Sequence, residues 1–248
     1  MLASLLLVPA CGDDAGDTGD EVGTTDGADM DTDTDTGVAD GRDFYDGEAS
    51  AALGADGNQA RCSTCHSDDG TLTGFSGKTM KDIAFKENFK GGGADLLGAA
   101  NACITGWMSG PALTADDPSY VALAAFLESI SDPSVTTPNT IAPEVLADEA
   151  EYEAMYAGGD AAAGEAKYDT FCAKCHGGGL VVGQIPAYPK ASLSGYTIGR
   201  IAQKVRTSGP PPSGTNDATD TTPGPMPFFE AEELPAADLA DIIAHLKG

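Results

Sequence analysis

The chain has 248 residues and is strongly acidic, with 39 Asp or Glu, 13 Lys or Arg, and a formal net charge of −26. This balance argues against nucleic acid as a partner, because the chain has too few Lys and Arg side chains to neutralise phosphates. It also argues against electrostatic attachment to anionic lipid. Aromatic residues make up only 6% of the sequence, whereas there are 32 glycines. We therefore expect small cores and long loops.

Residues 1–11 form a short apolar segment that ends in Val8-Pro9-Ala10-Cys11. The segment is too short to span a bilayer. A small residue followed by Cys resembles the end of a bacterial lipoprotein signal. Such a signal begins with positively charged residues, whereas this chain has no Lys or Arg before Arg42. We expect Cys11 to be lipidated. The alternative is an ordinary signal peptide in which this Cys has no role.

Residues 12–40 are rich in Asp, contain no Lys or Arg, and include the run Asp31-Thr-Asp-Thr-Asp-Thr36. A segment of this composition cannot bury enough apolar surface to fold. We predict a disordered acidic linker that holds the rest of the chain away from a membrane. Contact with that membrane would be by the lipid anchor only.

The pattern Cys-x-x-Cys-His occurs twice, as Cys62-Ser63-Thr64-Cys65-His66 and, 110 residues later, as Cys172-Ala173-Lys174-Cys175-His176. This is the spacing of c-type haem attachment, in which two thiols bond to one porphyrin and the next residue presents an imidazole to the iron. A zinc site needs four ligands gathered together, and each motif supplies three. The sequence therefore predicts two covalently bound haem c groups, attached at Cys62, Cys65, Cys172 and Cys175 and ligated by His66 and His176.

The repeated motif predicts two tandem domains of about one hundred residues each. We expect an all-α fold, with a few short helices around each haem. The predicted domains are residues 41–132 and 141–248, joined by a linker at 133–140. Because haem is attached to c-type cytochromes outside the cytoplasm, we expect an exported protein of the periplasm or the outer cell envelope.

Two predicted helices flank the second motif. Gly164 and Tyr168 are four residues apart and share one helix face, where the missing side chain of Gly164 permits close approach of another helix. Residues 234–246 place apolar side chains at the three-and-four spacing of an amphipathic helix. In these features the sequence resembles the class I cytochromes c, in which a Gly-x-x-x-aromatic helix crosses a C-terminal helix that ends in an apolar-aromatic-Leu pattern.

The resemblance assigns roles to further residues. Ile243-Ala244-His245-Leu246 matches the C-terminal pattern, which implies that His245 is a packing residue and not an iron ligand. The family's distal ligand corresponds to Met226, in Gly224-Pro225-Met226-Pro227, 50 residues after His176. A His and Met pair raises the reduction potential of haem iron.

Two other features of the second domain follow from the same resemblance. The family places a proline whose preceding carbonyl accepts the haem histidine N–H, and Pro186 and Pro189 are the candidates. Arg200 and Arg206, on a predicted helix at 198–206, are candidates to pair with haem propionates, the alternative being a solvated surface.

The first domain repeats this pattern with departures. Gly41-Arg-Asp-Phe-Tyr45 supplies the first element, and Ala125-Phe126-Leu127 matches the end of the closing helix. No proline lies between His66 and Pro111, so the acceptor for the His66 N–H is not identified by the sequence.

The sixth ligand of the first haem has two candidates. Met108 lies 42 residues after His66 and shortly before the closing helix, and it is the ligand that we predict. Cys103 is the alternative, because a thiolate binds ferric iron strongly and some dihaem thiosulfate-oxidising enzymes use a Cys ligand. A small buried thiol with no role in ligation is the third interpretation of Cys103.

The leading functional prediction is electron transfer, with both irons cycling between Fe(II) and Fe(III). Two six-coordinate irons leave no open position for a substrate, which favours a carrier over an enzyme. We expect redox proteins as partners, and the acidic charge is suited to a basic docking surface. The alternatives are a dihaem oxidoreductase similar to thiosulfate dehydrogenase, with Cys103 as an axial ligand, and a cytochrome subunit of a larger oxidoreductase.

Overall fold

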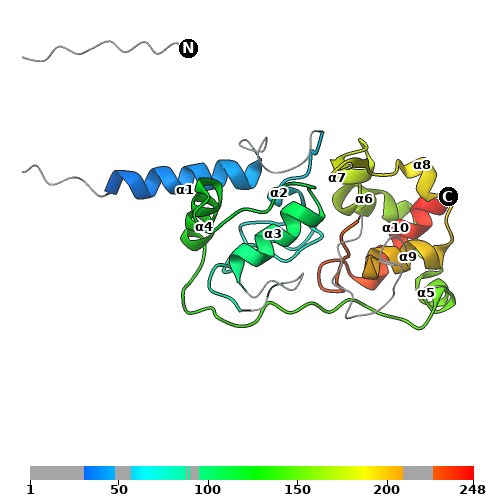
Figure 1. The fold of residues 1–248 in the computed structure, drawn as a ribbon. Coiled ribbons are helices and arrows are strands. Elements are labelled where there is room, and N and C mark those ends of the chain that lie inside the picture. Colours follow the sequence, from blue (N-terminus) through cyan, green and yellow to red (C-terminus); the bar gives the residue numbers. More distant parts are fainter. Residues whose placement is uncertain (1–30, 48–56, 88, 90–94, 209–225) are drawn as a thin grey trace, which may run out of the picture. The chain divides into compact units, whose positions relative to one another are not determined.

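The computed structural model describes residues 31–47, 57–87, 89, 95–208 and 226–248, without the side chains of 31–36. The predicted signal segment with Cys11 and the linker up to residue 30 lie outside the described residues. The described chain is mainly helical, as expected (Figure 1). Its elements are α1 (Asp31–Asp46), α2 (Cys62–Cys65), α3 (Leu96–Gly106), α4 (Pro118–Ser129), α5 (Glu149–Tyr156), α6 (Ala161–Phe171), α7 (Ala173–His176), β1 (Val181–Val182), β2 (Ile185–Pro186), α8 (Lys190–Leu193), α9 (Ile198–Thr207) and α10 (Ala236–Lys247).

The strands form one antiparallel pair, with Val181 opposite Pro186 and Val182 opposite Ile185. Among the described residues, no helix is long and apolar enough to cross a membrane.

The start of α1 corrects one prediction. We expected residues 12–40 to be disordered, but the helix begins at Asp31, so residues 31–40 are helical. The physical reason is cooperativity. Val38, Phe44 and Tyr45 pack into the first core, and once those turns are formed each further residue adds a backbone hydrogen bond at little cost.

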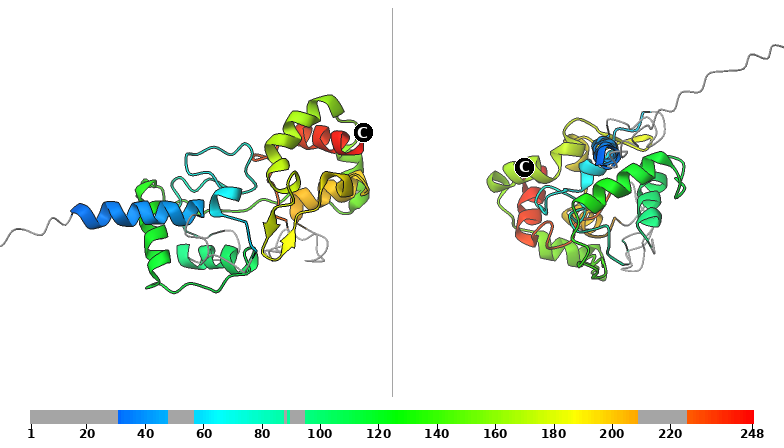
Figure 2. Two further views of the ribbon diagram at one scale, coloured as in Figure 1. Left: turned by 90° about the horizontal axis from the view of Figure 1, so that it is seen from above. Right: turned by 90° about the vertical axis from the view of Figure 1, so that its left-hand side faces the viewer.

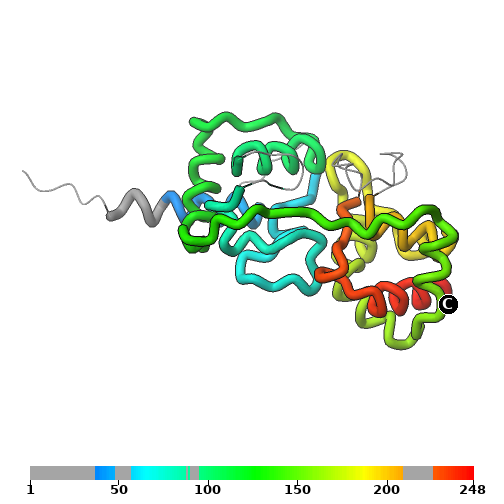
Figure 3. Tube along the Cα trace, turned by 90° about the horizontal axis from the view of Figure 1, so that it is seen from below, coloured from blue at the N-terminus to red at the C-terminus, as the bar shows by residue number. Residues whose placement is uncertain are grey.

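Two hydrophobic cores lie in the described residues, one on each side of the connection between α4 and α5. The largest buried side chains of the first are Phe44, Tyr45, Phe89, Ile104, Met108 and Phe126. The second is built around Tyr152, Tyr156, Tyr168, Phe229, Leu239 and Ile243. The predicted linker at 133–140 falls in the irregular connection between these cores (Figure 3). The residue boundaries of the two domains stay predictions.

Each core is organised by a pair of crossing helices, α1 with α4 and α6 with α10 (Figures 1 and 2). A Cβ atom at Gly41 would lie 1.9 Å from the carbonyl oxygen of Ala122, and one at Gly164 would lie 2.0 Å from that of Asp241. The two glycines therefore allow backbone-to-backbone contact that no larger residue permits. This confirms the role predicted for the small residue at both crossings.

Aromatic side chains pack between the crossing helices, with Tyr45 and Tyr168 each one helical turn after the crossing glycine. The rings of Tyr45 and Phe126 have centroids 5.3 Å apart, and those of Tyr168 and His245 are 5.7 Å apart, both pairs tilted by about 45°. His245 thus packs against the partner helix, as expected, and its Nε2 lies 2.5 Å from the Lys190 ammonium.

Acidic side chains begin several of the helices. Asp95, Asp117, Asp148 and Asp160 are N-caps, and each accepts a hydrogen bond from a backbone N–H of the first turn. Such a cap contributes about 1 kcal/mol. Part of the chain's negative charge is therefore used to begin the helices that flank the motifs.

The two halves of the described chain contact each other through the β1–β2 hairpin. The Gln59 N–H donates to the Val181 carbonyl (2.8 Å), and the Val181 N–H donates to the Gln59 side chain (2.9 Å). The Gly183 N–H donates to the Asn58 side chain at 2.9 Å, and Val182 packs against the first core.

Candidate functional site

The second motif forms a single helical turn. Cys172 ends α6 and begins α7, and the His176 N–H donates to the Cys172 carbonyl at 2.9 Å. Positions three and four apart on a helix lie on one face. The turn therefore directs Cys172, Cys175 and His176 toward one region.

The ring of His176 is held by the main chain. Its Nδ1 lies 2.7 Å from the carbonyl oxygen of Tyr188, which can only accept, so Nδ1 carries the proton. Nε2 is then the unprotonated nitrogen and is available to a metal. Tyr188 directly precedes Pro189. This confirms the prediction that the carbonyl before a proline accepts the histidine N–H, and it identifies that proline as Pro189 and not Pro186.

A cavity of about 500 Å³ adjoins this histidine, and Cys172, Cys175, His176 and Met226 all line it. Apolar side chains complete most of the wall, among them Phe171, Leu193, Ile201, Val205, Phe229, Leu239, Ile242 and Leu246. The structure thus brings together the attachment cysteines, the proximal histidine and the distal methionine that the sequence predicted. The preceding residues of the methionine loop, 224 and 225, lie outside the described residues.

Met226 is tied to α9 by a residue for which the sequence carried no signal. The Ser208 hydroxyl donates to the Met226 carbonyl oxygen. Ser208 caps α9 in the left-handed conformation, with φ of 61°, which directs its side chain toward the returning chain. This bond positions the backbone of the distal residue at the cavity wall.

Arg200 and Lys204 of α9 line the cavity, together with Lys174 of the motif. Burial lowers the pKa of Lys204 to about 8, and the positive charge of Arg200 acts in the same direction. Arg200 therefore lines the cavity, and its pairing with haem propionates stays a prediction. Lys204, which the sequence did not single out, joins it.

Arg206 has a different role from the propionate partner that we considered. Its side chain is fully buried, and its Nε donates to the Tyr156 hydroxyl at 2.8 Å. The guanidinium also pairs with Glu144 and donates to the Phe229 carbonyl. A buried guanidinium requires such partners, so Arg206 joins α5, α9 and the segment after Met226 into one core.

The chemistry of these groups suits a covalently bound haem. Two thiols, an imidazole and a thioether share an apolar cavity, and the cations of Arg200 and Lys204 offer partners for carboxylates. Burial raises the pKa of Cys172 to about 12 and that of Cys175 to about 11, and the neighbouring thiol in each case, Cys175 and Cys65, adds to the effect. A thioredoxin-like redox pair has a lowered thiol pKa, so the raised pKa values of Cys172 and Cys175 disfavour that alternative function for the motif.

The first motif reproduces the histidine geometry. α2 covers Cys62–Cys65, and the His66 N–H donates to the Cys62 carbonyl at 3.0 Å. His66 Nδ1 lies 2.7 Å from the Lys78 carbonyl oxygen, so Nε2 is again the unprotonated nitrogen. Lys78 follows His66 by twelve residues, as Tyr188 follows His176. The acceptor that the sequence could not identify is therefore a backbone carbonyl with no proline after it.

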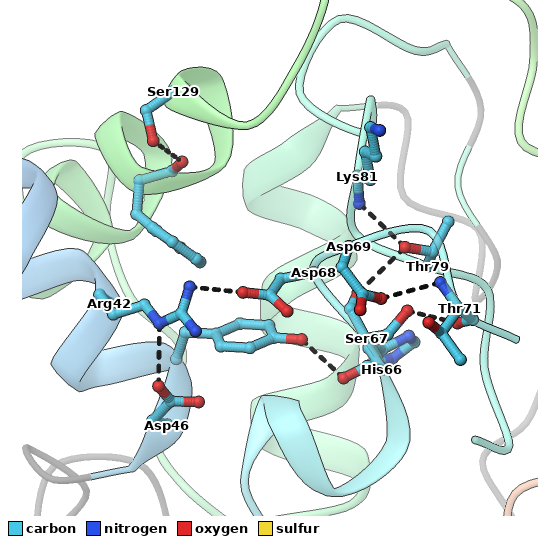
Figure 4. Close-up of polar contacts among 12 residues, drawn as sticks. Arg42, Asp46, His66, Ser67, Asp68, Asp69, Thr71, Thr79, Lys81 and Ser129 are labelled. Carbon is cyan, nitrogen blue, oxygen red and sulfur yellow. Dashed lines mark hydrogen bonds and ion pairs between the residues drawn. The ribbon is translucent and has the colours of Figure 1, made fainter. Parts of the chain in front are cut away.

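Polar contacts hold the chain on both sides of His66 (Figure 4). The Tyr45 hydroxyl donates to the His66 carbonyl oxygen at 2.6 Å. Arg42 lies between Asp46 and Asp68, with which it forms ion pairs. These contacts join α1 to the motif, so the helix crossing and the histidine are positioned together.

Gly77 lies against the imidazole of His66. A Cβ atom there would be 2.4 Å from the ring carbon Cε1. The corresponding position in the second half, eleven residues after the histidine, is Ala187. A side chain at position 77 would therefore collide with the imidazole of His66, a constraint that the sequence did not reveal.

The candidates for the sixth ligand of the first site lie at the end of α3 and just after it. Met108 is 5% exposed and belongs to the first core. Cys103 lies near Cys62, whose pKa is raised to about 12 by burial and then by the Cys103 and Cys65 thiols. Met108 as the ligand stays a prediction, with Cys103 as the alternative.

Residues 159–246 match the family model described as "Cytochrome C oxidase, cbb3-type, subunit III". These residues form a c-type cytochrome domain. No curated protein matches the chain. The matched segment runs from just before α6 to α10 and contains the second motif, Met226, Arg200 and Lys204. A domain of this kind implies covalently bound haem c, electron transfer and redox protein partners, and it is typically found outside the cytoplasm. The first motif lies outside the match.

Proposed function

We propose that the chain is a dihaem c-type cytochrome that transfers electrons outside the cytoplasm. The observation that carries this proposal is the repeated environment of the two motif histidines. In each, Nδ1 bonds at 2.7 Å to the carbonyl of the residue twelve positions later. The equivalent helix crossings at Gly41 and Gly164 support the same conclusion for the first half.

The residues have distinct roles in this proposal. Cys62, Cys65, Cys172 and Cys175 attach the two haems, His66 and His176 are proximal ligands, and Met108 and Met226 are distal ligands. When bound, each haem supplies an iron that cycles between Fe(II) and Fe(III). The backbone carbonyls fix the imidazole rings and raise their basicity as ligands. Ligation of each iron by one His and one Met would leave no open position for a substrate, which favours electron transfer.

The charge of the chain bears on its partners. A net charge of −26 is suited to a redox protein with a basic docking surface, and long-range attraction would accelerate the encounter. Salt would slow that encounter by screening. Lipidation of Cys11 and location in the periplasm or outer envelope are parts of the same proposal.

The number of haems is the direct test. The purified protein should contain two covalently bound haems per chain, as measured by its pyridine haemochrome spectrum against protein concentration. The double substitutions Cys62→Ser with Cys65→Ser, and Cys172→Ser with Cys175→Ser, should each leave one. Cys103→Ser is the matched control and should retain two. One haem in the unmodified protein, unaffected by substitution of the first motif, would contradict the proposal.

A second candidate function is that of a dihaem oxidoreductase similar to thiosulfate dehydrogenase. The specific observation in its favour is the position of Cys103 beside Cys62. The EPR spectrum of the oxidised protein separates the two functions. A change of one haem signal in Cys103→Ala but not in Met108→Ala would favour the enzyme.

The third candidate is a cytochrome subunit of a larger oxidoreductase. The description of the matched family, which names an oxidase subunit, favours it. Purification of the native protein from its source membrane in mild detergent tests this candidate, because a subunit elutes with stoichiometric partner chains and a free carrier elutes alone.

A further inference from the structure

The two attachment motifs touch each other at equivalent positions. Thr64 and Lys174 each occupy the third place of their motif, and the Lys174 ammonium donates to the Thr64 carbonyl at 3.3 Å. The same ammonium lies 4.2 Å from the ring centroid of Phe75, within the range of a cation–π interaction. One side chain from the second motif thus contacts both the first motif and the loop that follows it.

The contacts around this point are reciprocal. Gln59, just before the first motif, bonds to Val181, just after the second. Conversely, Gly74 follows the first motif and lies against Thr170, which precedes the second; a Cβ at Gly74 would be 3.2 Å from the Thr170 carbonyl. Reciprocal contacts of this kind are the signature of a two-fold interface, here between two halves of one chain.

The first half also forms part of the wall of the second cavity. Thr64, Gly74 and Ser76 line it together with Cys175. The edge at which the second haem is attached is therefore covered by the segment that attaches the first.

We propose that these contacts form an electron-transfer junction between the two haem sites, with Lys174 as its positioning residue. The inference rests on the proposed dihaem function. Haem held by each motif would supply an iron that exchanges one electron, so that oxidation of Fe(II) at one site would balance reduction of Fe(III) at the other, with no proton or bond exchanged. The junction makes this exchange intramolecular, so that an electron accepted at either site reaches the other without a second protein molecule.

The first experiment measures proximity without turnover. EPR spectra of the fully oxidised protein are compared with the sum of spectra from the two single-haem variants, Cys62→Ser with Cys65→Ser and Cys172→Ser with Cys175→Ser. Adjacent ferric sites relax and broaden each other's signals, so the native spectrum should differ from the sum. Identity with the sum would overturn the junction.

The second experiment measures the exchange itself. After a light pulse reduces a small fraction of the haem, re-equilibration between the two sites should proceed at a rate independent of protein concentration. Lys174→Met should slow it severalfold, Lys174→Arg should restore it, and Lys190→Met, which removes the same charge away from the first motif, should leave it unchanged. Gln59→Ala should slow it through the reciprocal contact.

The outcomes separate the two proposals. The absence of a second haem overturns the proposed function. Two haems that exchange electrons at a rate proportional to protein concentration, or at the same rate in Lys174→Met, Gln59→Ala and the native protein, overturn only the junction. Unchanged reduction potentials in Lys174→Met would show that the slower rate comes from position and not from driving force.

Discussion

Backbone carbonyls position both motif histidines, by accepting a hydrogen bond from Nδ1 of His66 and of His176. The acceptor for His176 could be predicted because Pro189 marks it. The acceptor for His66 could not be predicted. Every residue has a backbone carbonyl, so the identity of Lys78 does not indicate that its carbonyl accepts this hydrogen bond.

Met226 provides the first prediction at this scale. Met226→Ala should open the sixth position of the second haem, so that its ferric form becomes high-spin, binds azide, and loses the absorption band of Met-ligated iron. The reduction potential should fall, because the thioether favours Fe(II). Met155→Ala is the matched control, since Met155 is 51% exposed on α5. A low-spin Met226→Ala with unchanged potential would assign the ligand elsewhere.

Lys204 provides a prediction about pH. Burial lowers its pKa to about 8, so it is charged below this value and loses its charge as pH rises through it. A positive charge at the cavity favours the reduced iron, which carries one charge less. The potential of the second haem should therefore fall as pH rises through the pKa of Lys204, and a bound propionate would shift this transition to higher pH.

The control is Lys204→Met, measured by potentiometric titration at several pH values. Its potential should be lower than that of the native protein below the transition and should not change across it. Equal slopes in both proteins would assign the pH dependence to another group.

At the scale of elements, each site depends on two helices that cross at a glycine. α1 and α4 bring Tyr45 to the His66 carbonyl. α6 leads into Cys172, and α10 forms part of the cavity wall. The sequence predicted these crossings because Gly-x-x-x-aromatic and three-and-four apolar spacing are local patterns. The sequence did not predict that α1 begins at Asp31, several residues before the turns that pack into the first core.

Alanine at either crossing should be destabilising. Gly41→Ala and Gly164→Ala place a Cβ within about 2 Å of a carbonyl oxygen, so the helices must separate, at a cost of about 1–3 kcal/mol or more. Gly37→Ala on α1 is the control, because nothing lies within 4 Å of its added Cβ. There the higher helix propensity of Ala should stabilise by up to about 1 kcal/mol. Chemical denaturation followed by circular dichroism measures all three.

At the scale of the whole described chain, the two halves are joined by charge as well as by the hairpin. The Lys78 ammonium lies 3.1 Å from a carboxylate oxygen of Glu230, whose side chain is 4% exposed, and also pairs with Glu232. Lys78 is also the residue whose carbonyl holds His66. A single residue therefore joins the proximal side of the first site to the segment that follows Met226.

Lys78→Met should weaken this connection. Glu230 would still accept the hydrogen bond from the Ala142 N–H but would lose its ion pair with Lys78. The free energy of unfolding should fall by about 1–3 kcal/mol. Burial acts to lower the pKa of Lys78, but its carboxylate partners raise it above the usual value. The contribution is therefore complete at neutral pH and is lost only as pH rises through that raised pKa.

Thermal unfolding of Lys78→Met at neutral and strongly alkaline pH tests this, with the exposed Lys81→Met as control. The difference from the native protein should be large at neutral pH and should diminish at alkaline pH. An equal difference at both would mean that the charge of Lys78 is not what stabilises the contact.

The sequence by itself determined the covalent chemistry and the local structure of this protein. Haem attachment requires two cysteines and a histidine within five residues, and the helix crossings of this chain use a glycine one turn from an aromatic residue. Short sequence patterns therefore predict both features. Tertiary structure alone decided which groups from distant segments meet. Examples are Lys78 at His66, Arg206 in the core while Lys204 faces the cavity, and Lys174 at Thr64. Backbone carbonyls and cations are available at many positions, and only the packing of helices selects among them.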